Sequence, residues 1–340
     1  MKKILIIGSQ GMLGQELVEV FKKDSDYKVI AWDKKDIDIA NEKEVMKKVG
    51  FTKPDVIINA AAYNAVDKCE ADAKEYALAK KVNGLAPGYL AKAAKKNKAI
   101  LVHYSTDYVF DGDFGKLISK EPAGCTHSCA TCSLHDNFQP EIGYHEDDLP
   151  NPISKYGKTK LLGEKEVAKN MSSKGGSAYG GKNYYLIRIS KLFGKPALSE
   201  GAKKSFFDIM LELGKTKKEV KVVDEETSCF TYAPDLAKKT KEVIDSEKPF
   251  GIYHITNGGS CTWYEAAVEL YKQASAGGGS AYGGKIKAKI IPVSGAEFPR
   301  PAKRPPYSVL VNTKLNPMRD WKEALKEYLI NSKLQAPNSK

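Results

Sequence analysis

The sequence predicts an α/β fold in which a doubly wound parallel sheet carries helices on both faces and a smaller C-terminal lobe follows. Residues 2–7 form a short, almost fully apolar run, typical of a strand buried on both faces of a parallel sheet. A glycine turn at 8–14 and a helical pattern of apolar residues follow at once. Apolar runs at 54–59, 100–105 and 184–187 supply further strands of the same sheet.

Chain length and segment order predict two units. At 340 residues the chain is longer than a typical single domain. We expect residues 1–193 to form the sheet domain, with about 223–257 completing the sheet. The lobe is expected to comprise 194–222 and 258–335, with the functional site between the two units. A cysteine-rich insertion is expected at about 115–143.

The composition argues against two other classes of protein. The net charge of +12 comes from lysines spread along helical segments such as 91–98 and 214–221, without an aromatic and basic module for nucleic acid. No apolar run approaches the roughly 20 residues that span a bilayer, and the N-terminus is typical of a buried strand rather than a signal peptide. We therefore expect a cytoplasmic protein that binds neither nucleic acid nor membrane.

Three glycines directly follow the first predicted strand and open the first predicted helix. Glycines at this place let the backbone approach a ligand, and the helix start offers amide groups to a dinucleotide pyrophosphate. Their three-residue steps differ from the commoner Gly-x-Gly-x-x-Gly spacing. The residues expected to bind the cofactor here are Gly8, Gln10, Gly11, Met12, Leu13 and Gly14.

Acidic and basic residues after the second predicted strand bear on the choice of cofactor. Asp33 ends that strand at about the offset where a ribose 2′-hydroxyl is accepted, which favours NAD. Lys34 and Lys35 follow at once and could neutralise a 2′-phosphate, so NADP stays open. Asp38 and Ile39 come next, in a loop expected to meet the adenine edge.

Two further strand ends are expected to line the site. The residues after the third strand are small, which lets the backbone approach the cofactor. They are Ala60, Ala61, Ala62 and Tyr63. The strand at 100–105 ends in the hydroxyls of Ser105 and Thr106, at the edge where ligands of open α/β sheets bind. Thr106 is therefore expected to hydrogen-bond a substrate carbonyl.

Tyr156 and Lys160 predict the chemical step. Four residues apart on a helix, they lie on one face about one turn apart, so the Lys160 ammonium is expected to lower the pKa of the Tyr156 phenol. Such a phenol is a usable acid near neutral pH. Read with the glycine loop and Thr106, the pair indicates carbonyl reduction by hydride transfer from NADPH or NADH.

A cluster of thiols and imidazoles lies within the predicted insertion. Its members are Cys125, His127, Cys129, Cys132 and His135. Three cysteines and one histidine at this spacing suit zinc, with either imidazole as the fourth ligand, and the cysteine spacing also resembles that of an iron–sulfur cluster. An ordinary insertion with reduced thiols is the alternative.

The whole chain resembles the dTDP-4-dehydrorhamnose reductases, which are extended short-chain dehydrogenase/reductases with a Rossmann fold. The resemblance covers residues 1 to about 330 apart from insertions. It rests on the segments 8–14, 56–68, 105–112, 151–160 and 300–310. The resemblance implies reduction of the C4 keto group of dTDP-4-dehydro-6-deoxy-L-mannose to dTDP-L-rhamnose by NADPH or NADH.

The resemblance also assigns roles to residues. Thr106, Tyr156 and Lys160 would be the catalytic trio, with Tyr156 and Lys160 also contacting the cofactor. Arg188 would lie near the nicotinamide. Substrate contacts are expected from Ser105, Asp107, Val109, Arg300 and Arg304, the last two because guanidinium groups grip diphosphate oxygens in pairs. A nucleotide sugar is thus the expected partner, and a homodimer is left open.

Some segments depart from the family pattern. Lys191 stands where a Trp is common, so an aromatic wall of the site can be missing, and substrate contacts within 221–232 are in doubt. Two identical linker-like copies of Gly-Gly-Ser-Ala-Tyr-Gly-Gly-Lys occur at 175–182 and 278–285. The alternative functions are another nucleotide-sugar 4-reductase or epimerase of the superfamily, or a non-catalytic NADP-binding regulatory subunit, which the intact trio disfavours.

Overall fold

The computed structural model describes most of the chain. The described residues are 1–120, 142–172, 183–199, 203–276 and 286–335. The predicted metal ligands Cys125, His127, Cys129, Cys132 and His135 lie outside the described residues, as do the two linker-like copies. The metal prediction therefore stays a prediction.

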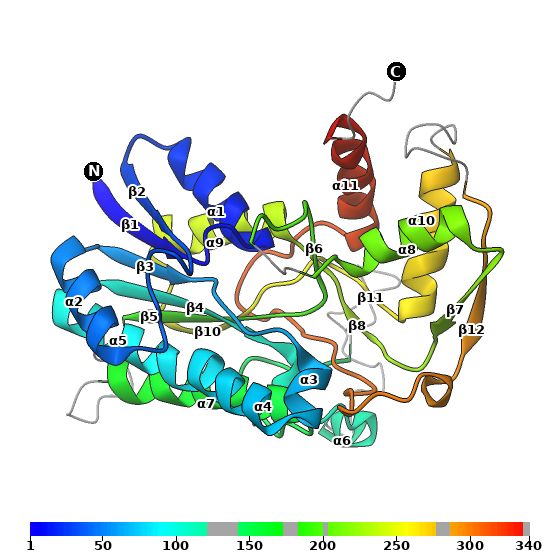
Figure 1. The fold of residues 1–340 in the computed structure, drawn as a ribbon, viewed down its shortest axis with the longest axis horizontal. Helices are drawn as coiled ribbons and strands as arrows, with labels where there is room; N and C mark the ends of the chain where they lie inside the picture. The colour runs from blue at the N-terminus through cyan, green and yellow to red at the C-terminus, as the bar shows by residue number, and fades with distance from the viewer. Residues whose placement is uncertain (121–141, 173–182, 200–202, 277–285, 336–340) are drawn as a thin grey trace, which may run out of the picture.

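A six-stranded parallel sheet forms the centre of the molecule, which confirms the predicted fold class (Figure 1). In spatial order its strands are β2 (Tyr27–Trp32), β1 (Lys2–Ile7), β3 (Val56–Asn59), β4 (Ile100–Thr106), β5 (Tyr184–Ile189) and β10 (Gly251–His254). The chain passes from β1 to β2 on one side and then to β3 on the other side of β1. This reversal makes a topological switch point, beside which ligands of such sheets bind.

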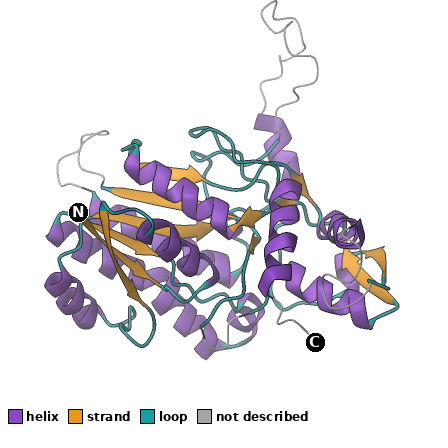
Figure 2. Cartoon of the chain, turned by 90° about the horizontal axis from the view of Figure 1, so that it is seen from above, coloured by secondary structure: helices purple, strands orange, loops and turns teal. Residues whose placement is uncertain are grey.

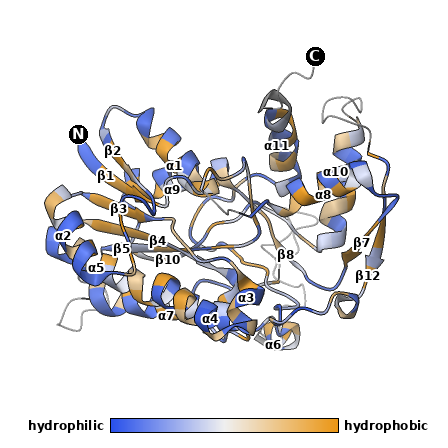
Figure 3. Cartoon of the chain, in the orientation of Figure 1, coloured by the Kyte–Doolittle hydropathy of each residue, from blue (hydrophilic) through white to orange (hydrophobic). Residues whose placement is uncertain are grey.

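Helices cover both faces of the sheet. Helices α1 (Met12–Lys22) and α9 (Ala233–Asp245) pack on one face, and α2 (Glu42–Thr52), α5 (Ala86–Asn97) and α7 (Lys155–Met171) pack on the other (Figures 1 and 2). In α1 the buried Leu13, Leu17 and Phe21 recur every four residues, which gives the helix one apolar face. The sheet strands are largely hydrophobic, whereas the helices alternate between hydrophobic and hydrophilic faces (Figure 3).

The segment between β3 and α5 is helical throughout. It comprises α3 (Val66–Ala71), α4 (Ala73–Ala79) and a π-helical stretch, Lys80–Leu85. Helix α7 packs closely against this stretch, because a Cβ on Gly163 would lie 2.2 Å from the Asn83 carbonyl oxygen. Gly163 thus sets the depth of α7 against the rest of the site.

The lobe has a core of its own. Helices α8 (Phe206–Thr216), α10 (Trp263–Ala276) and α11 (Trp321–Gln335) pack with the parallel pair β7 (Glu219–Val223) and β12 (Lys289–Val293). Its largest buried side chains include Phe207, Phe230, Leu270, Trp321 and Tyr328. This core also includes Phe230, which the predicted boundaries assign to the sheet domain, so the division into two units stays a prediction. None of the helices in the described ranges is both long and apolar enough to cross a bilayer.

Short elements connect the sheet domain with the lobe. The parallel pair β6 (Leu192–Phe193) and β9 (Thr231–Tyr232) continues from β5, and β8 (Ser228–Cys229) pairs with β11 (Ser260–Cys261). Helix α6 (Phe114–Lys120) begins the predicted insertion. The proline-rich segment after the 3₁₀ turn Gly295–Glu297 is extended, as predicted.

Candidate active site

The glycine loop has the geometry of a dinucleotide site. Gly8 has a φ of +80°, and a Cβ there would lie 2.7 Å from the Ala61 backbone nitrogen. A Cβ on Gly14 would lie 2.0 Å from the Gly8 carbonyl oxygen. Helix α1 begins after Gly11, and no side chain caps its first amides. The loop is therefore a close backbone cradle at a positive helix end, which fits a pyrophosphate.

Asp33 connects the end of β2 with this loop. One carboxylate oxygen accepts from the Gln10 amide at 2.9 Å and the other from the Lys34 amide at 2.8 Å. Asp33 is half-buried, while Lys34 and Lys35 are exposed. The carboxylate therefore holds the loop in place, and its contact with the ribose stays a prediction. Preference between NADH and NADPH stays a prediction.

The two residues expected near the adenine differ in exposure. Asp38 is exposed, and its carboxylate accepts from the Ala40 amide at 3.0 Å. Ile39 is only 7% exposed and packs in the core between the sheet and its helices. The side chain of Asp38 is thus the more accessible of the two, and both contacts stay predictions.

The segment after β3 is held by a residue that the sequence reading missed. Asn83 accepts from the Tyr63 amide at 2.8 Å and donates to the Tyr63 carbonyl at 2.9 Å. Its amide also donates to the Thr159 hydroxyl at 3.3 Å on α7. Asn83 therefore fixes the expected cofactor-binding segment against the catalytic helix. The only sequence signal for this role was the Asn-Gly pair at 83–84, inside a helical pattern rich in Lys and Ala.

Helix α7 carries Tyr156 and Lys160 into the site. Ser154 caps the helix by accepting from the Gly157 amide at 3.1 Å. A Cβ on Gly157 would lie 2.2 Å from the Tyr108 carbonyl oxygen, so the glycine brings α7 against the turn that follows β4. Tyr156 and Lys160 are 8% and 3% exposed.

Thr106 lies where α7 meets the end of β4. Its hydroxyl lies near enough to the Tyr156 phenol to lower the pKa of that phenol. It also donates to an Asp107 carboxylate oxygen at 2.9 Å and accepts from the Tyr108 amide at 3.2 Å. The structure therefore brings two members of the predicted trio close together. Lys160, the third, donates from Nζ to the Tyr104 carbonyl oxygen at 2.6 Å.

The electrostatics of the trio correct one prediction. Burial raises the pKa of Tyr156, the charge of Asp107 adds to this, and Thr106 opposes it. Burial lowers the pKa of Lys160 to about 8, and Glu164 opposes this. The prediction that Lys160 lowers the pKa of Tyr156 is wrong for this geometry, because Lys160 bonds the Tyr104 carbonyl and burial dominates at the phenol. Tyr156 is therefore protonated at neutral pH and available as an acid.

The Asp107 carboxylate holds the Thr106 hydroxyl in position. The carboxylate is 3% exposed and accepts from Thr106, from the Ser190 hydroxyl at 2.8 Å and from the Ser308 hydroxyl at 2.7 Å. Burial raises its pKa, and the three hydroxyl donors oppose this. Both oxygens are thus used within the protein, and a direct contact of Asp107 with substrate finds no support here. Ser190 and Ser308 were not predicted, because no local spacing links them to Thr106.

Two other residues predicted near β4 lie deeper than expected. Val109 is fully buried, and its side chain packs in a cluster with Phe110 and Tyr144, so a contact with substrate could come only from its backbone and stays a prediction. Ser105 is 3% exposed, and its hydroxyl has no hydrogen-bond partner among the described residues. Its contact with substrate stays a prediction.

Arg188 forms a buried ion pair. Its guanidinium donates to Glu164 on α7 through two bonds, of 3.1 and 2.8 Å, and lies over the Phe110 ring. The two side chains are 1% and 6% exposed. Arg188 therefore ties α7 to β5, and its place near the nicotinamide stays a prediction.

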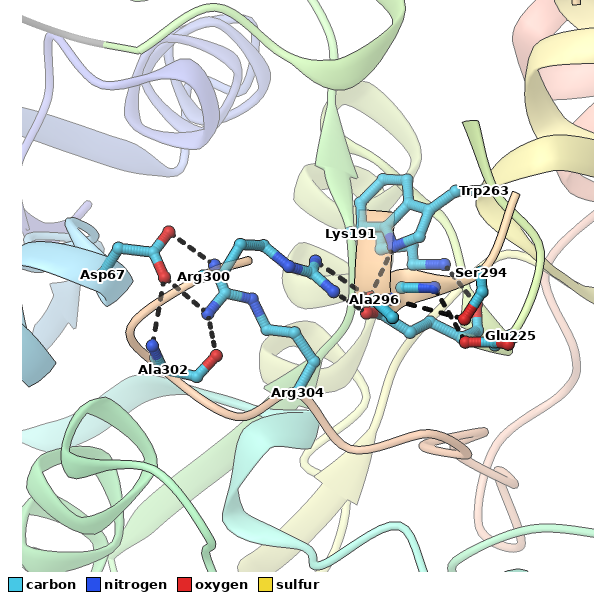
Figure 4. Close-up of polar contacts among 11 residues, drawn as sticks. Asp67, Lys191, Glu225, Trp263, Ser294, Ala296, Arg300, Ala302 and Arg304 are labelled. Carbon is cyan, nitrogen blue, oxygen red and sulfur yellow. Dashed lines mark hydrogen bonds and ion pairs between the residues drawn. The ribbon is translucent and has the colours of Figure 1, made fainter. Parts of the chain in front are cut away.

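The two arginines expected to bind diphosphate lie on the extended loop before Tyr307, and both hold carboxylates (Figure 4). Arg304 donates to both oxygens of Asp67 on α3, at 2.9 and 2.7 Å. Arg300 pairs with Glu226, which precedes β8. The loop thus links the sheet domain with the lobe. Binding of a diphosphate by these groups stays a prediction.

A cavity of about 740 Å³ lies beside this loop rather than at the glycine loop. Its lining includes Asp111, Phe114, Asn151, Ile153, Thr227 and Tyr307. Asn151 and Ile153 lead directly into α7, so the cavity adjoins the segment that carries Tyr156. Across the described part of the chain, no group of three or more His, Cys, Asp or Glu side chains is arranged to hold a metal.

Comparison with known proteins decides the family. The family described as the RmlD substrate binding domain matches residues 1–334. The chain belongs to that family. The spore coat polysaccharide biosynthesis protein SpsK of Bacillus subtilis is 32% identical to it over 333 residues, covering 97% of each chain. This finding confirms the resemblance drawn from the motifs.

Solved structures of the same family agree with the observed fold. A dTDP-4-dehydrorhamnose reductase from Clostridium acetobutylicum is 37% identical, with a TM-score of 0.77, and the match covers 97% of this chain and 99% of that one. The dTDP-4-dehydrorhamnose reductase from Bacillus anthracis, solved in complex with NADP, is 31% identical, with the same TM-score and coverage. The RmlD-family architecture therefore extends over the sheet domain and the lobe alike.

Proposed function

We propose that the chain is an NAD(P)H-dependent reductase that converts the C4 keto group of dTDP-4-dehydro-6-deoxy-L-mannose to the alcohol of dTDP-L-rhamnose. The observation that carries the proposal is that the buried Tyr156 and Lys160 of α7 meet the end of β4, where Thr106 lies and where Lys160 bonds the Tyr104 carbonyl, in a sheet that also carries the glycine cradle. Full-length similarity to proteins named dTDP-4-dehydrorhamnose reductase supports the substrate.

The residues of the sheet edge suit a nicotinamide dinucleotide. Gly8, Gly11 and Gly14 would hold the pyrophosphate against the start of α1, with Asp33 at the adenosine ribose. The segment Ala60–Tyr63 would flank the nicotinamide end. When bound, the reduced nicotinamide supplies the hydride that forms the new C–H bond at C4 of the hexose.

Tyr156 supplies the proton. As the C4 carbonyl accepts hydride, its oxygen becomes an alkoxide, and the Tyr156 hydroxyl donates its proton to that oxygen. Thr106 orients the carbonyl oxygen, and Asp107 fixes Thr106. Lys160 carries positive charge below about pH 8 and would hold the nicotinamide ribose.

Arg300 and Arg304 are the proposed diphosphate ligands. Both are paired with carboxylates in the structure, so the diphosphate would have to share or replace Glu226 and Asp67. The Asp67 side chain is 41% exposed, which makes its exchange for a phosphate inexpensive. The hexose would then lie between this loop and Tyr156.

The proposal is tested by incubating purified protein with NADPH and dTDP-4-dehydro-6-deoxy-L-mannose and identifying the product by NMR. We expect stoichiometric oxidation of NADPH and formation of dTDP-L-rhamnose. Conversion of the sugar without net consumption of NADPH would indicate an epimerase. Tight NADPH binding without turnover would indicate a non-catalytic subunit.

A further inference from the structure

Lys191 occupies an unusual position between the catalytic network and the lobe. It follows Ser190, whose hydroxyl donates to Asp107, and it precedes β6. Its backbone φ of +33° lies in the left-handed region, which residues other than glycine seldom adopt. The Thr231 amide donates to the Lys191 carbonyl at 3.2 Å, and this bond helps to fix the backbone there.

The Lys191 ammonium lies over an aromatic surface. Nζ is 3.9 Å from the centroid of the Trp263 ring (Figure 4). It is 5.1 Å from the centroid of the Phe230 ring. It donates a long hydrogen bond of 3.4 Å to the Glu226 carbonyl oxygen. Trp263 and Phe230 thus bring the aromatic surface under Lys191 from two different segments of the chain.

The groups that act on the Lys191 charge belong both to the network around Thr106 and to the lobe. Burial lowers its pKa to about 8, and the charges of Cys261, Asp107, Glu226 and Cys229 oppose this. The charge of Lys191 in turn lowers the pKa of Asp107. The carboxylate of Glu226 is already used by Arg300 and by the Trp263 indole, which donates to it at 3.0 Å. Within the described residues, Lys191 forms no ion pair, so its ammonium keeps donors for a ligand.

We propose that Lys191 is a specificity-determining residue whose ammonium, held over Trp263, donates hydrogen bonds to ring hydroxyls of the hexose. This inference rests on the proposed function and identifies a side chain that recognises the substrate of that reaction. The hexose is favoured over the diphosphate because Lys191 follows Ser190, which is bonded to the same Asp107 carboxylate as Thr106. Arg300 and Arg304, on the loop before Tyr307, already supply guanidinium groups for the diphosphate.

Lys191→Met tests the inference, since it removes the charge and the donors while keeping a similar length and the same backbone strain. We expect kcat/KM for dTDP-4-dehydro-6-deoxy-L-mannose to fall by about 10- to 100-fold, as for the loss of a hydrogen bond to a charged group. The inhibition constant of dTDP, which has the diphosphate but no hexose, should change less than about twofold.

Two further variants separate recognition from folding. Lys191→Arg should recover part of kcat/KM, and its KM should stay constant through pH 8, where the KM of the wild type rises as Lys191 loses its proton. Lys314→Met is the matched control, because Lys314 also lies over a ring, that of Tyr253, and donates to a carbonyl, that of Ile252, at 2.8 Å. It should keep wild-type kinetics.

Two results would overturn the inference in an active wild type. An unchanged kcat/KM in Lys191→Met would show that the ammonium does not meet the hexose. An equal loss of dTDP affinity would assign it to the diphosphate instead. A wild-type protein that binds NADPH but never reduces the sugar would overturn the proposed function itself, and the inference with it.

Discussion

Two arginine–carboxylate pairs flank the proposed site, and they differ in burial and in what they hold. Arg188 and Glu164 are 1% and 6% exposed and join β5 to the catalytic helix α7. Arg304 and Asp67 are 11% and 41% exposed and join the loop before Tyr307 to α3. An arginine–carboxylate ion pair is thus a fixed support at Arg188 and Glu164. At Arg304 and Asp67 it is a contact that a ligand can replace.

The difference follows from the cost of removing charge from water. A buried guanidinium without its carboxylate is strongly unfavourable, so Arg188 and Glu164 must stay together. An exposed carboxylate is well solvated alone, so Asp67 can give up Arg304 to a phosphate at little cost. The catalytic side is therefore expected to be rigid before ligands bind, and the substrate side adaptable.

Tyr156→Phe gives the largest expected effect and tests the rigid side. The variant loses the proton donor but keeps the ring, which packs edge-on against Tyr108. We expect kcat to fall by about 10²-fold or more, with NADPH affinity unchanged within a few-fold. Steady-state kinetics and NADPH titration by fluorescence measure the two quantities. Near-normal turnover would remove Tyr156 from the mechanism.

Glu164→Gln tests the buried support directly. It leaves the Arg188 charge buried without a partner, so we expect the free energy of unfolding to fall by about 3–5 kcal/mol. Denaturant unfolding measures the loss. Asp67→Asn is the matched control at the exposed pair, with an expected loss of about 0–1 kcal/mol. Equal losses at the two pairs would refute the contrast between them.

The pH dependence of kcat tests the burial of Lys160. The buried ammonium has a pKa of about 8, so it is charged below that pH and neutral above it. The charged fraction falls by roughly tenfold between pH 7 and pH 9, and kcat should fall with it. Glu164 raises the pKa of Lys160, so Glu164→Gln should move the decline to lower pH. A decline centred near pH 10 instead would contradict the burial argument.

Asp33→Asn gives the smallest expected effect and tests cofactor choice. The amide oxygen can still accept from the Gln10 amide, so the glycine loop keeps its support, while the negative charge is lost. We expect the ratio of NADPH to NADH affinity to rise by roughly a few-fold, because the carboxylate repels a 2′-phosphate. Asp38→Asn, also in the loop after β2, is the control and should leave the ratio unchanged.

The sequence located the glycine turn and the Tyr156–Lys160 helix, because their signals are local. The glycines at 8–14 follow a strand within one turn, and Tyr156 and Lys160 share one helix face, so short spacings carry the information. The parallel sheet followed from buried apolar runs in the same way. The pKa of Tyr156 did not, because burial of the phenol depends on packing from other elements.

The substrate side could not be predicted to the same extent. Asp107 bonds Ser190 and Ser308, which lie 83 and 201 residues away along the chain. The ring beneath Lys191 comes from Trp263 on α10. Such contacts form only when the lobe packs against the sheet. The spacing of residues within a single segment therefore cannot predict them.

Transfer of deuterium from the cofactor tests the central claim most directly. NADPH carrying deuterium at both C4 positions is incubated with the protein and dTDP-4-dehydro-6-deoxy-L-mannose, and the sugar product is examined by mass spectrometry and proton NMR. We predict dTDP-L-rhamnose with one deuterium at C4 of the hexose and one NADPH oxidised per product. A product without deuterium at C4, or sugar conversion without oxidation of NADPH, would contradict reduction at the Tyr156 site.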